Sequence, residues 1–173
     1  MAVREGLLAL LSTGSRHGYQ LKTGFEAATG GLWPLNVGQV YTTLERLERD
    51  GLVASSDADG QNRYELTDAG HGELGAWWGA VAFDEPPPRD ELMLKVLMAI
   101  DHGGAHALEV ITAQRTALTV LLQRRRRAAG AADNLVATLA HDALVVRAEA
   151  DLRWLDLCEA RVRAASQPKE TTR

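Results

Sequence analysis

A polar surface with little side-chain bulk is predicted on residues 36–50, a run with helical periodicity. Its outer face carries Gly38, Gln39, Thr42 and Arg46. A glutamine can pair with N6 and N7 of adenine, and an arginine can bind guanine or a phosphate. A glycine lets the backbone approach such a partner closely. This face can therefore lie against the edges of bases, and an ordinary solvated face is the alternative interpretation.

Further polar and basic side chains are predicted to flank this face. Thr43 can meet a phosphate or a thymine methyl group, and Tyr41 is either a contact residue or part of the core. Arg16 and Lys22, around the preceding helix, would flank the same duplex. The candidate nucleic-acid-binding residues are, in full, Arg16, Lys22, Asn36, Gly38, Gln39, Tyr41, Thr42, Thr43, Arg46, Gln61, Asn62 and Arg63.

The elements that must position these side chains follow from the apolar periodicity. Residues 3–12 and 17–28 are predicted to form two short helices, and the second is expected to bury Tyr19, Leu21 and Phe25. A third helix is expected to begin at Asn36, whose side chain would accept from the amide of Gln39 in a capping box. The inner face of this helix is predicted to carry Val37, Val40, Leu44, Leu47 and Gly51.

Strand composition and a turn signal follow the third helix. The stretches LVASS and RYEL are typical of strands, and Asp59-Gly60 between them favours a tight turn. Residues 67–70 begin a fourth helix, which carries Leu74, Trp77 and Trp78. Three helices, a hairpin and another helix in this order are typical of a winged helix-turn-helix domain, with Gln61, Asn62 and Arg63 at the wing.

The second half of the chain is predicted to be entirely helical, with helices at about 90–101, 106–128 and 133–165. Three successive prolines in EPPPRD separate it from the first half, because proline removes backbone donors and stops a helix. The predicted fold is mainly α with a small β-hairpin wing. The predicted parts are a winged helix-turn-helix domain (1–84), a Pro-rich joint (85–90), a helical dimerisation domain (91–165) and a flexible tail (166–173).

The last predicted helix carries apolar residues at coiled-coil spacing. A long helix with one apolar stripe usually needs a partner, so we expect a two-stranded interface in a homodimer. The predicted dimerisation residues are Val136, Leu139, Ala143, Val146, Ala150, Trp154 and Leu157.

Composition limits the function classes. The net charge is −4, and up to Val81 six basic residues face ten acidic ones, so nucleic-acid binding must use a local patch with modest salt dependence. The only cysteine, Cys158, excludes an internal disulfide, and no run approaches the length of a membrane span. Gly103-Gly104 between His102 and His106 disfavours a helical metal-ligand pair. We expect a cytoplasmic protein with no metal, no cofactor and no enzymatic activity.

Ordered motifs across the first half resemble those of the PadR family of bacterial transcriptional regulators. They are HGYQL from His17, NVGQVY from Asn36, LERLERDGLV ending at Val53, and YELTDAG from Tyr64. The resemblance implies a homodimer that grips a pseudo-palindromic double-stranded DNA operator and usually represses transcription. It also implies release by a small phenolic or planar effector. The wing departs from the family's basic wings, because DADGQN precedes a single arginine.

The sequence leaves alternatives for the role of the tryptophans and for the partner of the winged helix. Trp77, Trp78 and Trp154 can flank a cavity for a flat ligand, and core packing is the alternative for all three. The acidic balance of the first half also allows a winged helix that serves as a protein-interaction module and does not bind DNA. Salt-dependent retention on DNA would distinguish the two functions.

Overall fold

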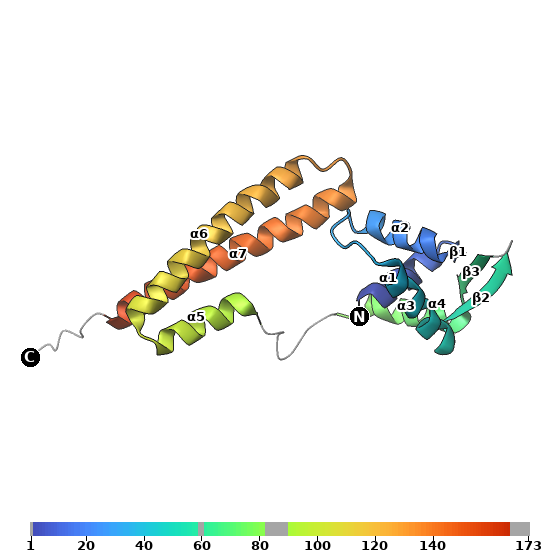
Figure 1. Cartoon of the computed structure of the whole chain (residues 1–173), viewed down its shortest axis with the longest axis horizontal. Coiled ribbons are helices and arrows are strands. Elements are labelled where there is room, and N and C mark those ends of the chain that lie inside the picture. The colour runs from blue at the N-terminus through green and yellow to red at the C-terminus, as the bar shows by residue number, and fades with distance from the viewer. Residues whose placement is uncertain (1, 59–60, 82–89, 167–173) are drawn as a thin grey trace, which may run out of the picture. The chain divides into compact units, whose positions relative to one another are not determined.

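The computed structural model describes residues 2–58, 61–81 and 90–166 (Figure 1). Contacts divide the chain into two compact units, Met1–Ala82 and Phe83–Arg173. The predicted Asp59-Gly60 turn lies outside the described residues, as do 85–89 of the predicted Pro-rich joint and 167–173 of the predicted tail. Asp90, predicted in the joint, caps the first helix of the second unit, and Ser166, predicted in the tail, is the last residue of its last helix.

The first unit combines four helices with a small sheet in its described residues (Figure 1). The strands lie in the order β1-β3-β2, and both neighbouring pairs are antiparallel. The predicted hairpin is β2 and β3; β1 was not predicted, because two residues are too few to form a strand pattern. In chain order the elements are α1 (Ala2–Leu11), β1 (Arg16–His17), α2 (Gly18–Ala28), α3 (Val37–Arg49), β2 (Val53–Ala58), β3 (Gln61–Leu66) and α4 (Asp68–Gly79).

One hydrophobic core joins these elements. Leu7 and Leu8 of α1, Leu21 of α2, and Leu44 and Leu47 of α3 are fully buried in it. The prediction that Tyr19 is buried is wrong, since the side chain is 64% exposed. The buried side of α2 consists of Gly18, Leu21 and Phe25.

The hairpin and α4 are joined by close backbone packing. The side chain of Thr67 caps α4 by accepting from the amide of Gly70 at 3.1 Å. A Cβ atom at Gly70 would lie 2.1 Å from the carbonyl oxygen of Leu52, so only glycine permits this approach of α4 to the start of β2.

The second unit is helical in its described residues and consists of α5 (Glu91–Asp101), α6 (Gly104–Gly130) and α7 (Leu135–Ser166). The long helices α6 and α7 lie side by side along their length, and α5 packs on α6 (Figure 1). Val96 of α5, Ile111 of α6 and Leu155 of α7 are fully buried where the three meet. The order of helices is as predicted, with α6 longer by about a turn than expected.

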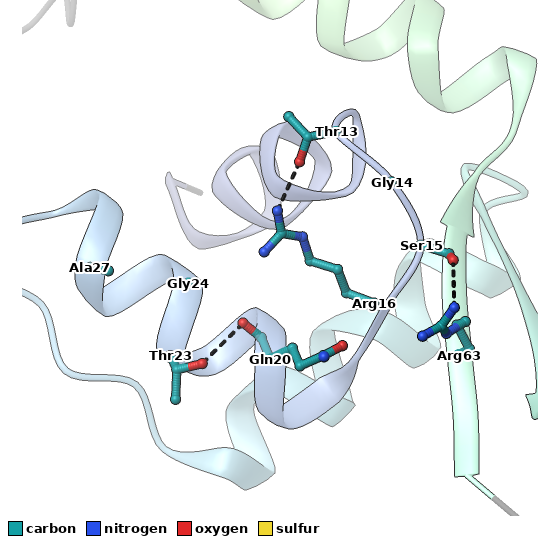
Figure 2. A pocket seen from close by; sticks show the side chains of 9 residues that line it. All are labelled: Thr13, Gly14, Ser15, Arg16, Gln20, Thr23, Gly24, Ala27 and Arg63. Carbon is teal, nitrogen blue, oxygen red and sulfur yellow. Dashed lines mark hydrogen bonds between the residues drawn. The ribbon is translucent and has the colours of Figure 1, made fainter. Parts of the chain in front are cut away.

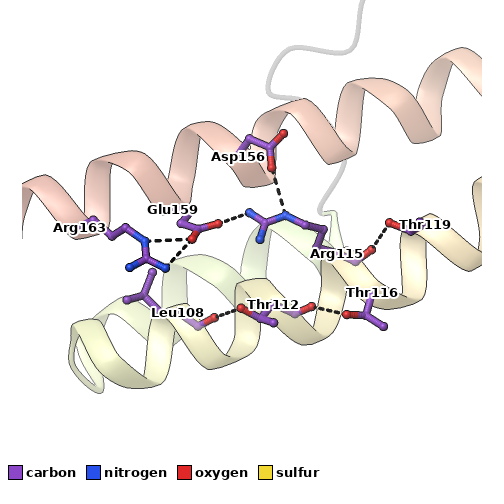
Figure 3. A network of polar contacts seen from close by, with 8 residues as sticks. All are labelled: Leu108, Thr112, Arg115, Thr116, Thr119, Asp156, Glu159 and Arg163. Carbon is purple, nitrogen blue, oxygen red and sulfur yellow. Dashed lines mark hydrogen bonds and ion pairs between the residues drawn. The ribbon is translucent and has the colours of Figure 1, made fainter.

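A charged network fixes α6 against α7 near this core (Figure 3). Arg115 of α6 donates through Nε to Asp156 of α7 at 3.0 Å and through a terminal nitrogen to Glu159. Arg163 donates to the same Glu159 carboxylate at 2.7 Å. Hydrogen bonds from Arg163 first, and then from Arg115, lower the pKa of Glu159. The network is partly exposed, so it specifies the register of the two helices more than it stabilises them.

The predicted dimerisation stripe on α7 is largely exposed within this single chain. Leu139 is 59% and Val146 is 62% exposed, while Ala137, Ala148 and Leu155 form the buried side of the helix. Trp154 differs from the rest of the stripe, because it packs against the Val96, Ile111 and Leu155 core. The exposed members of the stripe are Val136, Leu139, Ala143, Val146, Ala150 and Leu157.

Candidate nucleic-acid interface

Helix α3 is held by its inner face and leaves its outer face in solvent. Val40, Leu44 and Leu47 recur at helical spacing and are fully buried. The prediction that Val37 belongs to this inner face is wrong: it occupies the first turn, where the core has ended, and is 41% exposed. The exposed residues include the predicted contact set Asn36, Gly38, Gln39, Tyr41, Thr42 and Arg46, whereas Thr43 is half-buried.

The start of α3 is capped differently from the prediction. The Asn36 side chain accepts from the amide of Gly38 at 2.8 Å, one residue earlier than the predicted partner, Gln39. Because the Asn36 side chain bonds to Gly38 and not to Gln39, the side chain of Gln39 is not part of the cap. Gln39 is exposed, so its amide is free to meet a partner molecule.

A carboxylate on α2 positions the segment that leads into α3. Glu26 accepts from the amide of Leu35 at 3.0 Å and from Nζ of Lys22 at 2.7 Å. The hydrogen bond from Lys22 first, and then the one from Leu35, lower the pKa of Glu26. The charge of Lys22, a predicted DNA contact, is therefore compensated within the domain. The role of Glu26 was missed, because nine residues separate it from Leu35 and no local pattern links them.

Tyr41 packs on the beginning of α2. A Cβ atom at Gly18 would lie 2.7 Å from the tyrosine ring, so the ring covers this glycine closely. The ring is nevertheless 40% exposed. Tyr41 was predicted to be either a contact residue or part of the core. One side of its ring packs on α2 and the rest faces solvent, so each prediction is partly right.

One edge of the α3 face borders a hollow of about 350 Å³ beside the start of α1. Gln39, Thr43 and Arg46 line the hollow together with Arg4 and Arg49. Arg4 is engaged with Glu73 at 2.8 Å, whereas no ion pair of Arg46 occurs within the described part of the chain. Arg46 is therefore the uncompensated cation of this edge.

The acidic residues of α3 differ in where they are directed. Glu48 accepts from the hydroxyl of Ser55 in β2, so its charge is turned toward the sheet. Glu45 is exposed beside Thr42 on the outer face. A phosphate approaching this part of the face would be repelled by Glu45, which limits the electrostatic contribution to any DNA binding.

The predicted contacts outside α3 are only partly described. Asn62 is exposed on β3, whereas the side chain of Gln61 lies outside the described part of the structure. Arg63 points to Ser15, with 3.5 Å between Nη1 and the hydroxyl oxygen, and Arg16 donates to Thr13 at 2.9 Å. Arg16 and Arg63 share one hollow, which has no α3 residue in its lining.

Comparison with known proteins decides the family of this unit. Residues 7–76 match the family described as "Transcriptional regulator PadR-like family". The first unit is a PadR-like domain. The resemblance predicted from the motifs is thereby confirmed.

Proteins similar to this chain include a regulator from Bacillus subtilis. The negative transcriptional regulator PadR of Bacillus subtilis (strain 168) is 30% identical over 101 residues, and the match spans about half of each protein, 54% of this chain and 54% of the relative. The crystal structure of Bacillus subtilis PadR in complex with p-coumaric acid has a TM-score of 0.69 at 21% identity, over 94% of this chain and 99% of that chain. The complex of the same protein with operator DNA gives 0.66, with the same identity and coverage. These structures confirm the predicted fold.

The PadR-like domain contains an aromatic hollow of about 420 Å³. Trp77 and Trp78 of α4 line it, with ring centroids 4.4 Å apart, and Trp33 of the α2–α3 connection lies at the same hollow. Phe25 and Leu10 complete its apolar wall. The role of Trp33 was missed, because nothing in its local sequence distinguishes a pocket residue from a loop residue.

The histidines and the cysteine outside the PadR-like domain do not form a metal or redox site among the described residues. The rings of His102 and His106 lie 5.7 Å apart at the α5–α6 junction, and no group of three or more possible metal ligands occurs among the described residues. Cys158 is half-buried, and burial raises the pKa of its thiol, so it behaves as a packing residue. Within the described ranges, no helix combines the length and apolar character that a membrane span requires.

Proposed function

We propose that this chain is a homodimeric transcriptional repressor that binds a pseudo-palindromic DNA operator and releases it on binding an aromatic small molecule. The exposed outer face of α3 in a PadR-like domain carries this proposal. The Bacillus subtilis PadR structures, which contain operator DNA in one case and p-coumaric acid in the other, support the choice of both partners.

The first turns of α3 would enter the major groove. Gly38 lets the helix backbone approach the bases, Gln39 can read an adenine, and Arg46 can bind guanine or a phosphate. Thr42 lies between them on the exposed face and can meet a thymine methyl group. Lys22 and Glu26 hold the start of α3 in place, so the helix is positioned before the duplex arrives.

The second unit would join two copies through α7. Burial of apolar surface contributes about 25 cal/mol per Å², and Leu139, Val146 and Leu157 offer such surface along one side of a 32-residue helix. Two copies related by a twofold axis would present two α3 helices to two half-sites. An inverted repeat in the operator follows from this symmetry.

The effector would bind against tryptophan. The hollow at Trp33, Trp77 and Trp78 offers flat apolar walls to an aromatic ligand, while Trp154 belongs to the second unit and packs there. A phenolic acid brings an aromatic ring of suitable size, and the ring could stack on an indole.

The proposal is tested by duplex binding of α3 variants. A duplex is first selected from a random pool with the wild-type chain, and affinities are then measured by fluorescence anisotropy. Gln39→Ala and Arg46→Ala should each weaken binding by about 1–3 kcal/mol, or roughly 5–150-fold, because each removes a contact to a base or phosphate. Gln123→Ala, an exposed glutamine of α6, is the matched control and should not change affinity.

Two outcomes would contradict the proposal. If both α3 variants bind as tightly as the wild type, α3 is not the recognition helix. If the folded wild-type chain selects no sequence and is not retained on DNA at low ionic strength, the winged helix serves a protein partner instead.

A further inference from the structure

A hollow of about 610 Å³ lies beside α2 on the PadR-like domain (Figure 2). Arg16 of β1 reaches to Thr13 in the α1–β1 connection, and Arg63 of β3 reaches to Ser15 in the same connection (Figure 2). The wall thus draws on the α1–β1 connection, the paired strands β1 and β3, and α2. Its lining residues are Thr13, Gly14, Ser15, Arg16, Gln20, Thr23, Gly24, Ala27 and Arg63.

This hollow, here called the two-arginine pocket, carries uncompensated positive charge. Neither Arg16 nor Arg63 forms an ion pair within the described part of the chain, and no lining residue is acidic. Three other cations of the same unit are engaged: Arg4 with Glu73 and Glu5, Lys22 with Glu26, and Arg49 with Asp50. Arg46 is also unpaired among the described residues, but it lines a different hollow. Arg16 and Arg63 meet at one hollow, and both donate to neutral hydroxyl groups.

The pocket lies on a different side of α2 from α3. Lys22 and Glu26 face the segment that leads into α3. Gln20, Thr23 and Ala27 line the pocket instead, and helical spacing turns them away from Lys22 and Glu26. The pocket is therefore separate from the outer face of α3 that the proposed function assigns to bases.

We propose that the two-arginine pocket binds the phosphate group of a small molecule. Arginine presents planar N–H donors that match phosphate oxygens, and each guanidinium has five, so Arg16 and Arg63 can keep their present hydroxyl partners while binding an anion. The side-chain NH₂ of Gln20, whose oxygen accepts from the amide of His17, supplies further donors. The volume exceeds that of a phosphate ion, which leaves room for the rest of the molecule.

Inorganic phosphate is the probe that tests this site, without DNA, on the full chain. Isothermal titration and thermal unfolding should show saturable binding and a concentration-dependent rise in Tm. Arg16→Gln and Arg63→Gln should each weaken phosphate binding about tenfold or more, because each removes charge-assisted hydrogen bonds. Arg46→Gln, which removes an unpaired arginine outside the pocket, should bind phosphate as the wild type does.

Folding is controlled for by Arg63→Lys, which keeps the charge and should retain part of the affinity, and by the Tm of each variant without phosphate. The proposal is overturned if the folded wild type shows no saturable phosphate binding, or if Arg16→Gln and Arg63→Gln bind phosphate unchanged. It is also overturned if those two variants lose only affinity and salt dependence for DNA while free phosphate never binds. In that case the arginines serve the duplex backbone, and the proposed function stands without this site.

Discussion

Replacing Gly38 with alanine separates a DNA-binding face from a merely solvated one. Gly38 lies in the first turn of α3 and is exposed. Alanine favours a helix over glycine by about 1 kcal/mol at an interior position, and by less in the first turn. Stability and DNA affinity should therefore change in opposite directions if the helix backbone touches the duplex.

The structure limits the size of the stability effect. A Cβ atom at Gly38 would meet one neighbour within 4 Å, Oδ1 of Asn36 at 3.3 Å, and that oxygen also accepts the Gly38 amide at 2.8 Å. The new methyl group would shift the Asn36 side chain slightly, which would offset part of the stability gained from the higher helix propensity of alanine. We expect the free energy of unfolding to rise by between zero and about 1 kcal/mol, a Tm increase of at most roughly 8 °C for a domain of this size.

The effect on operator binding should be opposite and larger. A methyl group between the helix backbone and the base edges would displace the helix, and losing one well-formed base contact costs about 1–3 kcal/mol. Gly72→Ala is the matched control, because Gly72 lies in α4, is exposed and has no neighbour within 4 Å of its built Cβ. Calorimetry gives the Tm of both variants, and anisotropy with the selected duplex gives their affinities.

One result would refute the reasoning about α3. If Gly38→Ala and Gly72→Ala both gain stability and both bind the duplex as the wild type does, the low bulk of the α3 face has no role in DNA binding. A fall in Tm for Gly38→Ala alone would instead mean that the Asn36 cap was lost, and a lower affinity of that variant would then reflect a disturbed helix start.

Two further predictions concern the positioning of α3 and the pairing of chains. Because the pKa of Glu26 is lowered in the folded state, its stabilising effect should be present above its unfolded pKa and lost as the pH falls through the folded value. The Tm deficit of Glu26→Gln relative to the wild type should thus be largest above about pH 5 and shrink below about pH 4; a pH-independent deficit would refute the role of the charge. Leu139→Glu, which places a carboxylate on the exposed stripe of α7, should shift the chain toward monomer in analytical ultracentrifugation, whereas Gln123→Glu on α6 should not. Equal dimerisation of both variants would exclude this side of α7 from the interface.

The order of elements could be predicted from the sequence because it depends on local patterns. Apolar spacing in α3, the strand composition on either side of Asp59-Gly60, and the helix start at Thr67 are each encoded within a few residues. The outward direction of Gly38, Gln39 and Thr42 follows from the same spacing, once Val40 and Leu44 are assigned to the core. That part of the candidate site was therefore predictable.

The sequence-based predictions were wrong or incomplete where contacts between residues far apart in the sequence decide burial and strand pairing. Tyr19 has the composition of a core residue, but Gly18, Leu21 and Phe25 already fill the buried side of α2. The strand β1 exists only because Arg16 pairs with Tyr64, 48 positions away. The pairing also brings Arg16 and Arg63 to one pocket, whereas their separate positions in the sequence suggested two independent contacts with a duplex.

The distribution of compensated charges explains how an acidic domain could recognise DNA as we propose. Lys22 neutralises Glu26, which holds the segment before α3, and Glu48 is turned toward Ser55. The negative charges of Glu26 and Glu48 therefore do not oppose a duplex strongly. Arg46 remains as an uncompensated cation beside the α3 face, with Glu45 nearby on the same helix. Since the salt dependence of binding grows with the number of phosphates neutralised, few such cations mean a shallow dependence. Affinity must then come mainly from hydrogen bonds and close backbone approach to bases, which are the contacts that distinguish one sequence from another.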